Sequence, residues 1–105
     1  MVRATFRRAA GQLRSVEVSG HAGCGEAGED IVCASVTSAL QLVCNAVTEV
    51  QKLPAQVLVE ENRIRLTLPE EASGEAERSV QALLLQLRLL EQEYPQNIKT
   101  TVLEV

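Results

Sequence analysis

The sequence predicts one mixed α/β (α+β) domain spanning residues 1–105, with the element order ββαββαβ. Five short segments have the alternation or the apolar content of strands, and two longer segments carry an apolar stripe at helical spacing. A chain of 105 residues is long enough for one modest hydrophobic core. We therefore expect a mostly antiparallel, mixed sheet with both helices packed on one face.

The first two strands are expected at the N-terminus. VRATFRR alternates apolar Val2, Ala4 and Phe6 with polar residues, which is the period-two pattern of a strand with one buried face. LRSVEVS follows the turn-like AAGQ and has one irregularity in its alternation. The two segments are expected to form a hairpin.

The first helix is expected over residues 31–52. Apolar residues there recur in steps of three and four and form one stripe: Val32, Val36, Ala39, Leu40, Val43, Val47 and Val50. Pro54 then ends the helix, because the residue before a proline disfavours helical geometry.

The remaining elements complete the order. AQVLVEE and RIRLTLP predict a second hairpin that turns at Glu61 and Asn62. A second helix is expected over residues 74–93, with its apolar face formed by Ala76, Val80, Leu83, Leu84, Leu87 and Leu90. NIKTTVLEV is the last strand.

Composition and charge disfavour several classes of partner. The net charge of −4, the pI near 5.0 and the near absence of aromatic residues argue against direct binding of nucleic acid. The first hairpin carries a basic cluster: Arg3, Arg7, Arg8 and Arg14. We interpret this cluster as a solvated face, and binding of a specific anionic partner is the alternative.

The expected compartment is the cytoplasm. The N-terminus lacks the apolar region of a signal peptide, and the apolar run ALLLQLRLL is too short to span a membrane. In a reducing compartment, three cysteines are free thiols or ligands more often than disulfides.

One segment, GHAGCGEAGEDIVCASV, contains most of the residues whose side chains could take part in catalysis or metal binding. GHAGCGEAGE is expected to be a loop and DIVCASV the start of the first helix, with Asp30 as the N-cap. Cys33 would then be the third helical residue, close to unpaired amides that favour its thiolate and supply donors to an oxyanion. At 100° per residue, Cys33 lies about 80° from the centre of the apolar stripe, on the rim of the core.

His21 is the only histidine of the chain, so any Cys/His pair must use it. A loop with glycines at positions 20, 23, 25 and 28 can bring its two ends together, and a thiolate beside an imidazole is the minimum set for cysteine catalysis. Cys44, on the first helix, is interpreted as core filler.

Two alternatives to an enzyme stay open. In a non-catalytic ribosome-assembly or protein-binding module, the loop grips a partner and Cys33 is structural. In a small zinc-binding domain, His21, Cys24 and Cys33 are ligands with Asp30 or water, although the H-x2-C-x8-C spacing lacks the paired knuckles of structural zinc sites.

The blocks GHA and DIVCA, together with EQEYPQNI before the last strand, resemble the ribosomal-processing cysteine proteases, the Prp family, over essentially the whole chain. The resemblance implies an endopeptidase that needs no cofactor or metal and removes the N-terminal extension of a large-subunit ribosomal protein, number twenty-seven. It also implies a homodimer. From charge and composition, we expect no direct contact with nucleic acid or with a membrane.

The resemblance assigns roles to residues of the same segment. Cys33 is the nucleophile, His21 is the general base and acid, and Asp30 supports the site. Thr37 stands where the family commonly has serine. The mobile loop contains Gly20, Gly23, Gly25 and Gly28, and Cys24 receives no role.

Overall fold

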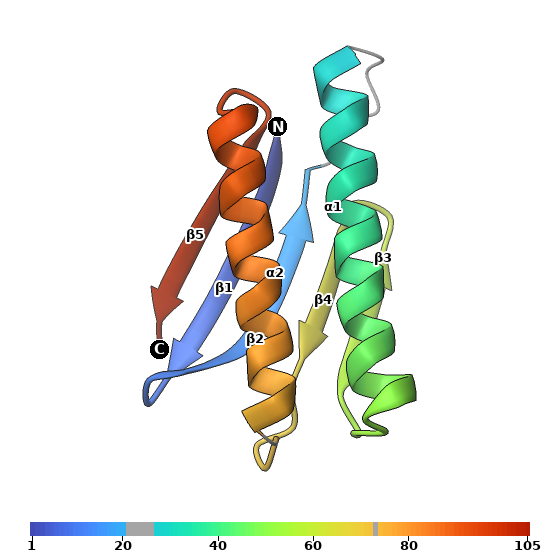
Figure 1. Ribbon diagram of the computed structural model, residues 1–105, viewed down its shortest axis with the longest axis vertical. Coiled ribbons are helices and arrows are strands. Elements are labelled where there is room, and N and C mark those ends of the chain that lie inside the picture. Colours follow the sequence, from blue (N-terminus) through green and yellow to red (C-terminus); the bar gives the residue numbers. More distant parts are fainter. Residues whose placement is uncertain (21–26, 73) are drawn as a thin grey trace.

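The computed structural model confirms the expected element order (Figure 1) and describes residues 1–20, 27–72 and 74–105. The strands are β1 (Val2–Ala9), β2 (Gln12–Ser19), β3 (Gln56–Glu60), β4 (Arg63–Thr67) and β5 (Ile98–Glu104). The helices are α1 (Ala27–Asn45), its π-helical continuation η1 (Ala46–Val50), and α2 (Gly74–Glu93).

The strands of the described residues form one mixed sheet in the order β3-β4-β2-β1-β5. Neighbouring strands pair antiparallel except β1 and β5, which pair parallel. Both helices cover the same face, with α1 over the half that contains β3 and β4, and α2 over the half that contains β1 and β2 (Figure 1). The predicted fold class is confirmed.

A bulge explains the irregular alternation of β2. Arg7 lies opposite Ser15 and Arg8 lies opposite Leu13, so the register between β1 and β2 shifts by one residue. The extra residue lets both Leu13 and Val16 face the core, although strict alternation would put them on opposite faces.

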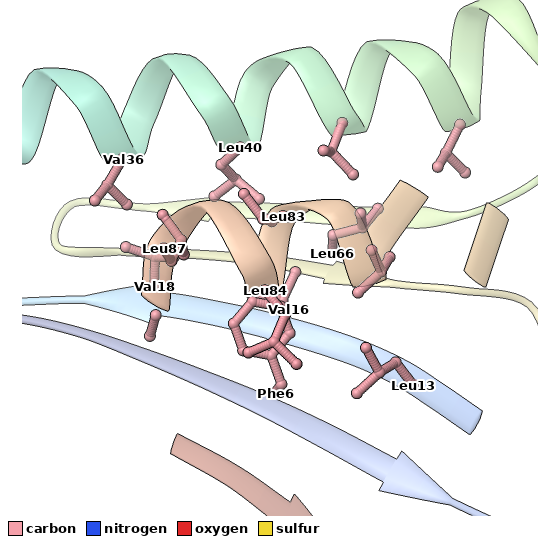
Figure 2. Packing of buried hydrophobic residues seen from close by; sticks show 14 of the residues in the cluster. Phe6, Leu13, Val16, Val18, Val36, Leu40, Leu66, Leu83, Leu84 and Leu87 are labelled. Carbon is pink, nitrogen blue, oxygen red and sulfur yellow. The ribbon is translucent and has the colours of Figure 1, made fainter. Parts of the chain in front are cut away.

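The core lies between the sheet and the two helices (Figure 2). Its largest fully buried side chains are contributed by β1, β2, α1, β4, α2 and β5: Phe6, Leu13, Leu40, Leu66, Leu83, Leu87 and Ile98. The buried face predicted for β1 (Val2, Ala4 and Phe6) is therefore confirmed, and so is the apolar face predicted for α2, where only Leu90 is partly buried.

The apolar stripe of the first helix ends at Val47, three residues earlier than expected. Val47 is buried, but Val50 is 78% exposed. The amide of Gln51 donates to the carbonyl of Ala46 at 2.8 Å, five residues back, as in a π-helix. Because this turn is wider than an α-helical one, a step of three residues no longer returns to the same face. The assignment of Val50 to the buried stripe is wrong.

The 20-residue stretch Ile31–Val50 is long and apolar enough to cross a membrane, with a mean hydropathy of 1.6 over an 18-residue window. A core helix meets the same two criteria. Its buried side chains belong to the core and account for part of this composition: Val32, Val36, Leu40, Val43 and Val47.

Candidate active site

Cys33 lies on α1 at the rim of the core, as the helical spacing predicts. Its side chain is partly buried and packs against the core cluster, next to the fully buried Val32. At 100° per residue, Cys33, Thr37 and Cys44 fall within about 40° of one another on α1. Cys44 faces β3, so these three residues occupy the flank of α1 that is turned toward β3 and away from α2.

The start of α1 corrects the expected boundary of the loop. The helix begins at Ala27, so Gly28 is a helical residue, and Asp30 is the fourth residue of the helix and not its N-cap. Alanine and glutamate favour helix strongly enough to extend it through Gly28, whose cost is only about 1 kcal/mol.

The earlier start also changes the surroundings expected for Cys33. Cys33 is the seventh residue of α1, whereas only the first four amides of a helix lack an intrahelical partner. The amide of Cys33 therefore belongs to the regular hydrogen-bond ladder. It does not supply the oxyanion donor that the sequence suggested.

Gly20 fixes the point where the chain leaves β2 toward His21. Its φ is +75°, and an added Cβ would lie 2.6 Å from the carbonyl oxygen of Met1. Its amide donates to the carbonyl of Asn62 at 3.2 Å, in the turn between β3 and β4. Gly20 is thus a rigid anchor in the structure, and only glycine fits there without strain. This anchor could not be predicted from the sequence, because Met1 and Asn62 are distant from Gly20 along the chain.

Ion pairs hold the β3–β4 hairpin beside β2. Glu17 accepts hydrogen bonds from Nε and Nη2 of Arg65 at 2.9 and 2.6 Å, and it lies 3.9 Å from Nε of Arg63. Arg63 also pairs with Glu60, whose hydrogen bond raises the pKa of Arg63 further above its usual value. These contacts keep the hairpin turn next to Gly20.

Cys44 lies in the wall of a hollow between α1 and β3. The hollow is about 370 Å³ and is lined by Leu40, Gln41, Cys44, Asn45, Val57, Val59 and Ile64. Burial raises the pKa of the Cys44 thiol, which keeps it protonated near neutral pH. Cys44 packs against the core, in keeping with the interpretation as filler, but it also forms part of this surface.

Several candidate residues lie outside the described residues: His21, Gly23, Cys24 and Gly25. The pairing of His21 with Cys33, the zinc alternative and the mobility of the loop therefore stay predictions. The structure brings together Cys33 and Thr37 on one flank of α1, and it places Gly20, the neighbour of His21, at the end of β2. A thiol on a helix flank at the rim of a core is accessible to a substrate held beside that helix.

Comparisons with known proteins show which family this chain is similar to. The family model described as cysteine protease Prp matches residues 1–99. The ribosomal processing cysteine protease Prp of Bacillus subtilis is 29% identical over 108 residues, which cover 96% of each chain. The protein of the same name from Staphylococcus aureus is 30% identical over 91 residues, or 85% of this chain and 86% of that protein.

Solved structures show the same fold. A protein of Streptococcus mutans, 29% identical, superposes with a TM-score of 0.92 over 100% of this chain and 96% of its own. The Staphylococcus aureus Prp with a covalently linked product peptide, 25% identical, has a TM-score of 0.87 over 98% of this chain and all of its own. Since the family model spans nearly the whole chain, this protein belongs to the Prp family of ribosomal processing cysteine proteases.

Proposed function

We propose that this protein removes the N-terminal extension of a large-subunit ribosomal protein, number twenty-seven, with Cys33 as nucleophile and His21 as general base and acid. The proposal is supported by the family match over residues 1–99 and by the position of the partly exposed Cys33 at the rim of the core. The Prp of Staphylococcus aureus has been solved with a substrate peptide and with a covalently linked product peptide.

The reaction proceeds through an acyl-enzyme. His21 takes the thiol proton, and the sulfur of Cys33 forms a bond to the scissile carbonyl carbon. His21 then gives that proton to the leaving amine as the C–N bond breaks, which releases the mature ribosomal protein. Water, activated by His21, attacks the thioester, frees the extension as a carboxylate and restores the thiol.

The family match is the observation that carries the proposal, and cleavage of the precursor tests it. The protein is incubated with the ribosomal precursor that bears its extension, and the products are identified by intact mass. One cut at the junction between extension and mature chain is expected. A precursor that stays intact would refute the proposed substrate.

Four variants test the assigned residues. Cys33→Ala and His21→Ala should both fold but leave the precursor uncut. His21 cannot be replaced by another imidazole, because the chain has no second histidine. Cys24→Ser and Cys44→Ala are the matched thiol controls, and both should still cut. Cleavage that persists without Cys33 or without His21 would refute the assigned dyad.

We further propose that the protein acts as a cytoplasmic homodimer and does not bind nucleic acid directly. The free thiols of Cys33 and Cys44 are compatible with a reducing compartment. Apolar side chains exposed on the outer faces of α1 and α2 offer a surface for a second copy: Ile31, Leu42, Leu85 and Leu89. Light scattering during gel filtration should give twice the monomer mass, and a monomer at working concentration would contradict the dimer.

A further inference from the structure

β3 is an exposed, apolar strand at one edge of the sheet. Val57 and Leu58 are each 42% exposed, and Val59 is 70% exposed. Unpaired edge strands of this kind invite other chains to pair with them, and proteins usually protect them with charges, prolines or a covering element. The strand itself, QVLVE, carries only one charged residue, at its end.

The opposite edge of the sheet, formed by β5, is capped in part by a side chain of α2. There, Glu91 of α2 accepts a hydrogen bond from the amide of Thr100 in β5 at 3.0 Å. Lys99 and Glu104 add charges along the same strand. Among the described residues, this contrast makes β3 the edge that is open to an added strand.

Val57 and Val59 present their main chains to this open edge. The hairpin turns through two residues, Glu61 and Asn62, so Glu60 and Arg63 form the hydrogen-bonded pair next to the turn. Hydrogen-bonded pairs alternate along an antiparallel ladder. The N–H and C=O groups of Val57 and Val59 therefore point away from β4.

The side chains of the same two valines lie on the face that carries the helices. Val57 is paired with Leu66, which is fully buried on that face, and Val59 is paired with Ile64. Both valines line the 370 Å³ hollow beneath α1. Each thus offers backbone hydrogen bonds and an apolar contact to the same added strand.

The hollow and the thiol of Cys33 lie along the same flank of α1. Cys44 in its wall and Cys33 share one flank of α1, about 16 Å apart along the helix axis. An extended chain of about five residues spans that length. The hydrogen bond between Gly20 and Asn62 places the far end of β3 beside the start of the His21 loop.

We propose that the substrate binds as an added β-strand along β3, with alternate apolar side chains seated between β3 and α1 and with its scissile bond beyond the hairpin turn at Cys33. The inference rests on the proposed function. Main-chain pairing supplies affinity in such complexes, and the hollow selects apolar residues at every second position.

Three variants distinguish this binding mode from a nonspecific effect of replacing an exposed apolar side chain on β3. Val57→Ser and Leu58→Ser are a matched pair, because the two side chains are equally exposed and adjacent but lie on opposite faces of β3. Val59→Pro removes one outward amide, which an edge strand tolerates. Val57→Ser and Val59→Pro should each raise KM about fivefold with little change in kcat, as expected for the loss of one contact made throughout the reaction. Leu58→Ser should change neither.

Binding is measured separately in the Cys33→Ala background, with a fluorescent peptide that spans the precursor junction. Its Kd should rise in step with KM. Equal effects of Val57→Ser and Leu58→Ser, or no effect of either in an enzyme that cuts, would overturn the inference and leave the proposed function intact. A change of oligomeric mass in Val59→Pro without a change in KM would assign the edge to a second copy and also overturn it. Failure of the unmodified protein to cut refutes the proposed function itself.

Discussion

Replacing Gly20 with alanine tests whether a fixed backbone anchors the residue before His21. Gly20 has a φ of +75°, and this left-handed conformation costs a residue with a Cβ about 1–2 kcal/mol. The added methyl group would also lie 2.6 Å from the Met1 carbonyl oxygen. Overpacking of this kind costs about 1–3 kcal/mol.

The Met1 carbonyl cannot easily retreat. The next residue, Val2, is fully buried, and its amide donates to the carbonyl of Asn97 at 2.9 Å. We therefore expect Gly20→Ala to lower the free energy of unfolding by about 2–5 kcal/mol, the sum of the two costs. In a domain of this size, Tm should fall by at least about 8 °C.

Gly11→Ala is the matched control. Gly11 has nearly the same φ, +78°, but nothing lies within 4 Å of its added Cβ. It lies in the turn between β1 and β2, at the opposite end of β2 from Gly20. Its loss should be limited to the backbone term of about 1–2 kcal/mol, measured for both variants by urea unfolding.

Activity supplies the second readout. Under conditions where both variants are folded, Gly20→Ala should reduce kcat/KM by tenfold or more, because a shift of about 1 Å in a reacting group is enough for such a loss. Gly11→Ala should leave kcat/KM unchanged. Equal losses of stability would refute the reasoning from the close approach to Met1. An unchanged kcat/KM in folded Gly20→Ala would refute the idea that this anchor positions His21.

Two further predictions concern the thiols and the ion pairs. Because burial raises the pKa of Cys44, iodoacetamide should modify Cys33 before Cys44 at neutral pH. Modification of Cys44 should accelerate as the pH becomes alkaline. Site-resolved mass spectrometry measures both rates, and equal rates at pH 7 would contradict the prediction. Glu17→Gln should lower the free energy of unfolding in urea by about 0.5–1 kcal/mol, since its arginine partners are partly exposed, and the loss should shrink in high salt; no loss would show that Glu17 does not hold the hairpin.

Local periodicity was sufficient to predict the elements of this fold. The alternation around Phe6 and the stripe from Val32 to Val47 both depend on which side chains one face must bury, and a sequence shows that directly. The start of α1 and the exposure of Val50 were missed for a related reason. The helix boundary depends on the sum of small propensities, and a π-helical turn changes the period itself.

The site was predictable only in part. The position of Cys33 on the rim followed from helical geometry, but the anchor at Gly20 depends on Met1 and Asn62, which approach it through strand pairing. The parallel pairing of β5 with β1 and the placement of β3 at the edge also depend on contacts between distant segments. No local pattern records them.

The strand order explains why Cys33 on α1 faces the β3 edge of the sheet. The chain leaves the central strand β2, passes through α1, and returns in β3, two places away at the edge of the sheet. α1 therefore lies over the β3–β4 half, with one flank toward α2 and the other toward the edge (Figure 1). A residue on the first flank would meet α2, whereas Cys33, on the second flank, meets the side from which an extended chain can approach. The same connection that buries the stripe of α1 thus leaves its thiol accessible to a peptide.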